Sequence, residues 1–258
     1  MTTRRSFLAA LASGSSVLYA ACESSTAVEP QTPDQSPFRL RFNARSPTHS
    51  GPTGSDVLLG DANRRAYLRV PPTYRPNAPA PLLIAFHGAG GRGTDWMGTY
   101  AARADAAGMI LLAPDSVGQT WDAVTADFGP DVALVNNVVD QLFDRYAIDA
   151  QRIGLIGFSD GASYAISLGI ANGDNVHQVI GFSPGFYVIA AQHGQPGFFI
   201  SHGTSDPVLA IDQSSRVIVP ALRKLGDSVD YVEFDGGHEV PAAIGDQAIA
   251  WLVTRFAH

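Results

Sequence analysis

One stretch constrains the fold of this chain more than any other: a short apolar run that ends in Gly-Phe-Ser-Asp-Gly at residues 157–161 and continues as a segment rich in small residues. An apolar run bounded by glycines is typical of a buried strand, and the segment after it is typical of a helix. Ser159 is then expected at the turn between them. Such a turn strains the serine backbone and leaves its hydroxyl exposed beside a helix N-terminus, whose amides favour negative charge. A serine nucleophile requires this setting.

The same five-residue pattern occurs a second time, at residues 181–185, with Ser183 at its centre. Chemistry separates the two copies, because in the strand–turn–helix arrangement one donor to the oxyanion is the backbone N–H of the residue after the serine. That residue is Pro184 in the second copy, and proline has no N–H. We therefore assign the nucleophile to Ser159 and interpret Ser183 as the start of an ordinary turn after a strand.

Strand-like and helix-like segments alternate along the rest of the chain. Two short runs at 56–59 and 66–70, joined by a turn sequence, predict a hairpin. Further apolar or alternating runs predict buried strands, and apolar residues spaced by three and four predict amphipathic helices. The additional strands are expected at 82–86, 109–113, before Ser159, 178–182, 197–201 and 229–234, and the helices at 94–107, 131–146, after Ser159, 211–225 with a kink at Pro220, and 242–256. This alternation predicts an α/β fold with a doubly wound, mostly parallel sheet and an N-terminal antiparallel hairpin.

A serine hydroxyl is a weak nucleophile unless a base takes its proton, and histidine is suited to that task near neutral pH. A carboxylate must then fix the imidazole tautomer and stabilise the imidazolium. The chain offers both groups after successive predicted strands, in the order Ser159, Asp206, His238. These three residues are the predicted catalytic residues.

Other side chains compete for the roles of base and acid. His87 and His202 also follow predicted strands, but each stands in a His-Gly turn, where a histidine more often caps local backbone. Asp212 is the alternative acid, and its position favours a role as cap of the following helix. We therefore assign the role of base to His238 and the role of acid to Asp206.

A glycine-rich loop at residues 87–91 follows the predicted strand 82–86. The loop has neither Gly-Lys-Ser/Thr nor the spacing of a dinucleotide site, so we expect its N–H groups to face a substrate oxygen rather than a phosphate. Ala89 is predicted to supply one oxyanion donor and the amide of Asp160 the other. The Asp160 carboxylate is expected to be structural or to border the pocket. The long loop 114–130 carries Trp121, a candidate pocket residue for which buried packing is the equal alternative.

The N-terminus resembles an export signal. Arg4 and Arg5 precede a weakly apolar stretch that is too short to span a membrane, in a pattern similar to the twin-arginine motif. Residues 18–22 resemble a bacterial lipoprotein box in which Cys22 becomes lipidated, although Tyr19 departs from the usual leucine. The alternative is ordinary cleavage nearby, with Cys22 incidental.

These patterns predict three parts: an export signal at 1–21, a lipidation site and disordered tether at 22–55, and a catalytic domain at 56–258. We expect an exported bacterial protein, periplasmic or at the cell surface, that contacts a membrane only through a lipid anchor at Cys22. No segment rich in lysine and arginine follows the N-terminus and the formal charge is −7, so no nucleic-acid partner is expected. The single cysteine and the scattered histidines favour neither a metal nor another cofactor.

From about Val57 onward, the chain resembles the α/β-hydrolase superfamily, and more narrowly the bacterial secreted esterases grouped with polyhydroxybutyrate depolymerases, feruloyl esterases and the phospholipase/carboxylesterase group. The resemblance lies in four motifs in fold order, at 87–91, 157–161, 202–208 and 236–238. It implies an α/β-hydrolase fold and a serine esterase that hydrolyses short acyl, feruloyl or hydroxyalkanoate esters, small or oligomeric, through an acyl-enzyme intermediate.

The family's lipases often insert a lid after the strand that ends at Phe182, and here only the short segment 183–196 is available, so no large lid is expected. Two alternatives stay open. One is a catalytically silent hydrolase fold that acts as a surface-tethered binding protein. The other is a serine peptidase on the same fold, although such peptidases usually carry an extra specificity domain.

Overall fold

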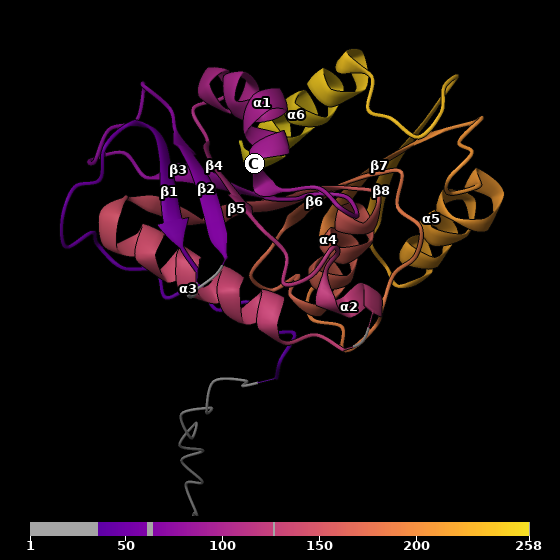
Figure 1. Ribbon diagram of the computed structural model, residues 1–258, viewed down its shortest axis with the longest axis horizontal. Coiled ribbons are helices and arrows are strands. Elements are labelled where there is room, and N and C mark those ends of the chain that lie inside the picture. Colours follow the sequence, from indigo (N-terminus) through magenta and orange to yellow (C-terminus); the bar gives the residue numbers. More distant parts are fainter. Residues whose placement is uncertain (1–35, 61–63, 126, 258) are drawn as a thin grey trace, which may run out of the picture. The chain divides into compact units, whose positions relative to one another are not determined.

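The computed structural model describes residues 36–60, 64–125 and 127–257, so the predicted export signal, Cys22 and the predicted tether as far as residue 35 lie outside it. Within these residues, eight strands form one sheet in the order β1-β2-β4-β3-β5-β6-β7-β8 (Figure 1). The strands are β1 Gly54–Leu59, β2 Arg65–Val70, β3 Ala80–Phe86, β4 Ile110–Pro114, β5 Ile148–Phe158, β6 Gln178–Phe182, β7 Gly197–Gly203 and β8 Ser228–Phe234.

Strand directions confirm the predicted doubly wound sheet. β1 pairs antiparallel with β2, and β2 antiparallel with β4, which makes the expected N-terminal hairpin. All other neighbours in the sheet run parallel. Because parallel strands end at one edge of a sheet, the loops after β3, β5, β7 and β8 emerge together there, which is where open α/β sheets place their ligands.

Helices cover both faces of the sheet (Figure 1). One face packs against α3, α4 and α5, and the other against α1 and α6. Side chains of β3 show the alternation, since Leu82 and Ile84 belong to the first core and Leu83 to the second. The helices are α1 Gly93–Ala106, α2 Asp122–Thr125, α3 Pro130–Arg145, α4 Asp160–Ala171, α5 Ser215–Lys224 and α6 Ala242–Phe256, with a short 3-10 turn, η1, at Ile211–Gln213.

Three predicted elements differ from the structure. The loop 114–130, expected to lack regular structure, contains the single turn α2. The helix expected over 211–225 is divided into η1 and α5, because the backbone of Ser214 is not helical, and Pro220 lies inside α5. β7 extends through the predicted His-Gly turn, since Gly203 still pairs with Phe234 of β8.

The predicted start of the folded part at residue 56 was too late. Leu40 is 1% exposed and belongs to the core against which α3 and α4 pack. The neighbouring Arg39 donates to the carbonyl of Ala171 at 2.6 Å and forms an ion pair with Asp174. Residues 38–41 are therefore part of the folded body. Among the described residues, no helix is long and apolar enough to cross a bilayer.

Candidate active site

Ser159 stands at the sharp turn between β5 and α4. Its φ of 56° and ψ of −122° lie in a region that non-glycine residues avoid, at a cost of about 1–3 kcal/mol. The turn also needs its two glycines, because a Cβ on Gly157 would collide with the carbonyl of Gly161, and a Cβ on Gly161 would collide with that of Phe86. The close fit of α4 against the ends of β3 and β5 thus fixes the position of the serine.

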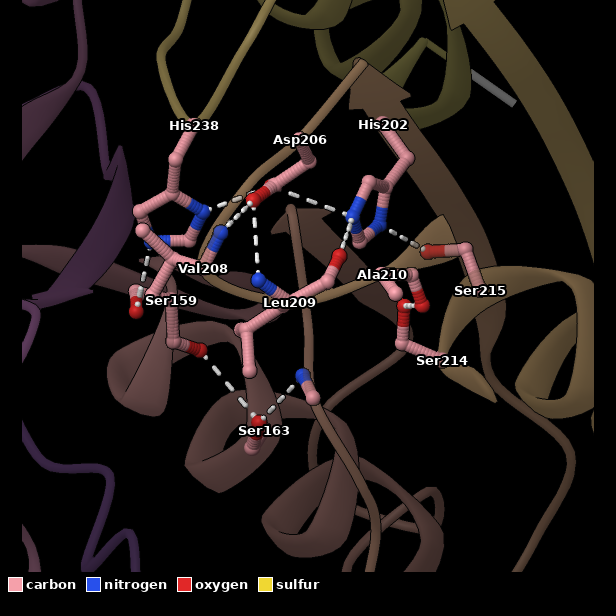
Figure 2. A network of polar contacts seen from close by, with 11 residues as sticks. Ser159, Ser163, His202, Asp206, Val208, Leu209, Ala210, Ser214, Ser215 and His238 are labelled. Atoms are coloured by element: carbon pink, nitrogen blue, oxygen red, sulfur yellow. Dashed lines mark hydrogen bonds and ion pairs between the residues drawn. The ribbon is translucent and has the colours of Figure 1, made fainter. Parts of the chain in front are cut away.

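The structure brings the three predicted catalytic residues into one hydrogen-bonded chain (Figure 2). His238 Nε2 lies 2.9 Å from Ser159 Oγ, and His238 Nδ1 lies 2.6 Å from Asp206 Oδ2. The Asp206 side chain is fully buried and that of His238 is 15% exposed. With Nδ1–H donating to the carboxylate, Nε2 is free to accept the serine proton.

The loop after β7 holds Asp206 in its ionised form. Its Oδ1 accepts from the amides of Val208 and Leu209, each at 2.8 Å. Burial alone would raise the pKa of Asp206, but the Leu209 amide, the His238 side chain and the Val208 amide together hold that pKa below its usual value. A charged carboxylate is what stabilises an imidazolium during acyl transfer.

The loop 87–91 passes beside the serine, since a Cβ on Gly88 would lie 3.3 Å from Ser159 Cβ. Within this loop the amide of Gly90 donates to Gln119 and that of Gly91 to Gly88. In the part of the chain that the structure describes, the amides of Ala89 and Asp160 donate to no protein acceptor. These are the two predicted oxyanion donors, and both are free for a ligand.

Hydrogen bonds of His87 and Trp121 hold the loop 87–91 in place. His87 donates from Nδ1 to the carbonyl of Gly88 at 2.8 Å and accepts at Nε2 from the amide of Ser116 at 3.1 Å. Burial lowers the pKa of His87 and keeps the ring neutral, as this arrangement requires. Trp121 donates from Nε1 to the His87 carbonyl at 2.8 Å.

The hypothesis that Trp121 lines the pocket was wrong, because its side chain is completely buried and stacks on Tyr164. Asp160, whose carboxylate was expected to be structural or to border the pocket, accepts from Thr120 Oγ1 at 2.7 Å. The loop that carries Thr120 and Trp121 therefore supports both sides of the oxyanion site.

Ser183 differs from the ordinary turn that was predicted. It is fully buried with a φ of 47°, so its backbone is strained as that of Ser159 is. Its hydroxyl has no hydrogen-bond partner among the described residues. No base within the described residues is hydrogen-bonded to this hydroxyl, and Pro184 supplies no donor.

A cavity of about 380 Å³ opens beside the serine. It touches all three loops of the site, through Gly88, through Phe158 next to Ser159, and through Val240 two residues after His238. Its remaining lining comes from His87 and from the α1 residues Asp95, Trp96, Thr99 and Tyr100. No sequence pattern indicated this cavity, because tertiary packing decides which residues of α1 line it.

Tyr100 contributes a buried aromatic side chain to the lining of this cavity. Its side chain is 3% exposed, and burial raises the pKa of its hydroxyl. No group of three histidine, cysteine or acidic side chains with metal-binding geometry occurs in the described part of the chain.

Comparisons with known proteins find esterases among the proteins that this chain resembles. Residues 122–244 match the model of the phospholipase/carboxylesterase family. Feruloyl esterase C of Emericella nidulans is 25% identical over 251 residues, covering 81% of this chain and 92% of the relative. The putative esterase NocK of Nocardia uniformis is 28% identical and covers 86% of this chain and 70% of the relative.

Two solved structures share the fold. A fluorophosphonate-binding serine hydrolase of Staphylococcus aureus superposes with a TM-score of 0.64 at 16% identity, covering 79% of this chain and 99% of the other. A ferulic acid esterase from Anaeromyces mucronatus, solved with ferulic acid, gives a TM-score of 0.61 at 18% identity and covers 82% and 96%.

Proposed function

We propose that the chain, which has the α/β-hydrolase fold and resembles the phospholipase/carboxylesterase group, is a serine esterase that hydrolyses carboxylic esters. The observation that carries the proposal is the hydrogen-bonded chain from Ser159 through His238 to Asp206, next to two unused amides. Acyl transfer by a serine requires this combination of nucleophile, base, acid and oxyanion donors.

The reaction proceeds in two steps. His238 takes the proton of Ser159, whose oxygen attacks the ester carbonyl, and the amides of Ala89 and Asp160 stabilise the oxyanion. The C–O bond to the alcohol then breaks as His238 returns the proton to the leaving oxygen. Water, deprotonated by His238, attacks the acyl-serine in the same way and releases the acid. Loss of one oxyanion donor costs roughly 100-fold or more in rate.

The cavity beside Ser159 is the proposed site for one arm of the ester. Trp96, Tyr100 and Phe158 provide aromatic walls for a planar group, and Asp95 and Thr99 provide polar ones. These walls, together with relatives that are named feruloyl esterases, make feruloyl esters the first substrates to test. Short acyl and hydroxyalkanoate esters complete the proposed range.

The test compares wild type with Ser159→Ala on p-nitrophenyl acetate and butyrate, followed by methyl ferulate, acetylated xylan and hydroxybutyrate oligomers. We expect hydrolysis by wild type and a fall of at least about 1,000-fold in the variant. The proposal fails if wild type hydrolyses none of these esters, or if Ser159→Ala keeps its rate.

We also propose that the protein is exported and lipid-anchored at Cys22, which lies outside the described residues. The support is the sequence pattern alone. Intact mass spectrometry of protein purified from membranes tests it: a diacylglyceryl mass on a chain that begins at Cys22 is expected, whereas an unmodified terminus contradicts the anchor.

A further inference from the structure

His202 lies on the side of Asp206 opposite to His238 (Figure 2). Its Nε2 atom is 3.2 Å from Asp206 Oδ2, the same oxygen to which His238 donates, and 2.8 Å from the carbonyl oxygen of Leu209. We infer that His202 is a positioning residue for the acid of the triad, an inference that rests on the esterase function proposed above. His202 is thus more than the local turn histidine predicted from its His-Gly sequence.

The neighbours of His202 determine its tautomer. The two atoms near Nε2, a carbonyl oxygen and a carboxylate oxygen, can only accept, so Nε2 must carry the hydrogen. On the other side of the ring, Nδ1 is 2.7 Å from Ser215 Oγ, and the Ser215 hydroxyl can donate to it. Both side-chain atoms of this second contact are buried. The ring is therefore held as the Nε2–H form by a donor on one side and two acceptors on the other.

The charges around His202 are consistent with a neutral ring. Burial of the ring lowers the pKa of His202, and this influence outweighs the Leu209 carbonyl and Asp206, which favour the imidazolium; His238 opposes the imidazolium as well. On β8, Glu233 is opposite His202 in the ladder, but its carboxylate forms an ion pair with Arg216 at 2.6 Å. A neutral His202 can thus direct its Nε2–H toward the Leu209 carbonyl and Asp206 Oδ2 together without adding a positive charge that would compete with the His238 imidazolium.

The contacts of Asp206 explain why this donor matters. Its Oδ1 is held by two backbone amides, while its Oδ2 is shared between His238 and His202. Leu209 takes part twice, because its amide donates to Asp206 and its carbonyl accepts from His202. Rotation of the carboxylate or displacement of this loop would break several hydrogen bonds together. His202 therefore keeps Oδ2 aimed at His238 Nδ1.

Two pairs of variants test the inference through kinetics. His202→Leu removes the donor, whereas His202→Gln retains a side-chain N–H. Ser215→Ala removes the donor to Nδ1, whereas Ser214→Ala removes the neighbouring hydroxyl, which donates to Ala210 and does not contact His202. We expect kcat to fall roughly 10- to 100-fold in His202→Leu and less in Ser215→Ala, the range of one hydrogen bond to a charged group, with KM unchanged.

The pH profile separates positioning from mere packing. In His202→Leu, Asp206 Oδ2 keeps only one of its two nearby N–H groups, so its charge stabilises the His238 imidazolium more strongly. The acidic limb of the pH profile of kcat/KM should therefore move to higher pH. His202→Gln should restore that limb, and Ser214→Ala should match wild type throughout. A loss of thermal stability in His202→Leu with unchanged kcat and unchanged limb would overturn the inference, as would a Gln variant no better than Leu.

NMR provides a readout that does not depend on ester hydrolysis or on the folding of a His202 variant. In ¹⁵N-labelled Ser159→Ala protein, long-range ¹H–¹⁵N correlations should show His202 neutral and protonated at Nε2 from pH 5 to 8. A ring protonated at Nδ1, or one that titrates in this range, overturns the inference. If wild type hydrolyses no ester while this spectrum is obtained, the proposed function fails and the hydrogen-bond arrangement stands.

Discussion

Gly203 lies where the end of β7 meets the loop that carries His238, and its replacement by alanine is the most direct structural perturbation of the site. A Cβ at this position would lie 2.5 Å from the carbonyl oxygen of Gly236 and would collide with that of Gly237. Both obstacles are backbone atoms, so no side chain can swing away to make room. Gly203→Ala must therefore push the histidine loop away from β7.

The size of this displacement follows from the contact distances. Real Cβ atoms essentially never come closer than 3.0 Å to such an atom, so relief of the Gly236 contact alone requires a separation of about 0.5 Å, and relief of the closer Gly237 contact requires more. A movement of about this size along the hydrogen bond would stretch the 2.9 Å contact between His238 Nε2 and Ser159 Oγ to about 3.4 Å. Because a displacement of about 1 Å can cost roughly 100-fold in rate, we expect kcat/KM to fall about 10- to 100-fold, or about 1.4–2.7 kcal/mol.

The assay is p-nitrophenyl acetate hydrolysis by Gly203→Ala at 25 °C, with circular dichroism and a thermal melt to show that the fold is kept. Gly98→Ala is the matched control, because Gly98 is exposed on α1 and a Cβ there meets nothing within 4 Å. That control should retain full activity and gain up to about 1 kcal/mol of stability. Wild-type activity in a folded Gly203→Ala protein would refute the reasoning.

Three further changes test other parts of the account. Burial raises the pKa of Asp227 to about 6, and neither carboxylate oxygen has a partner among the described residues. The folded-state pKa therefore lies above the unfolded value of about 3.9, so this group favours folding most below pH 4 and loses that contribution as pH rises through 6. Asp227→Asn should therefore raise the free energy of unfolding, measured in urea, by about 1–2 kcal/mol at pH 8 and leave it unchanged at pH 4. An equal gain at both pH values would contradict this. Ser183→Ala should keep kcat/KM within about twofold and cost no stability, because it removes a buried hydroxyl without a partner; a large loss of rate would reopen the choice of nucleophile. Trp121→Phe should lower kcat about tenfold at constant KM, since the His87 carbonyl loses its donor, and an unchanged kcat would show that the loop needs no such support.

Much of this site was predictable because the sheet is parallel. Ser159, Asp206 and His238 each follow a strand, and parallel strands end at one edge, so chain order alone brings the three side chains together. Ser159 was distinguished from Ser183 by the chemistry of the next residue. The strain at Ser183 was not predictable, since nothing in its local pattern requires a positive φ.

The errors share one cause, which is contact between segments far apart in the sequence. Trp121 stands in a loop without periodicity, so its burial against Tyr164 leaves no local signal. Arg39 and its neighbours read as tether, although their partners on α4 lie more than a hundred residues away. His202 reads as a turn residue because the pairing that extends β7 comes from β8.

The central claim is that Ser159 is an activated nucleophile, and covalent labelling measures this directly. An alkyl fluorophosphonate should add a phosphonyl group to Ser159, identified by intact mass and peptide mapping, with inactivation in step with labelling and no adduct on Ser159→Ala. The Asp206→Asn and His238→Ala proteins should label far more slowly. An adduct on Ser183, or an unlabelled Ser159 in protein that hydrolyses esters, would contradict the account.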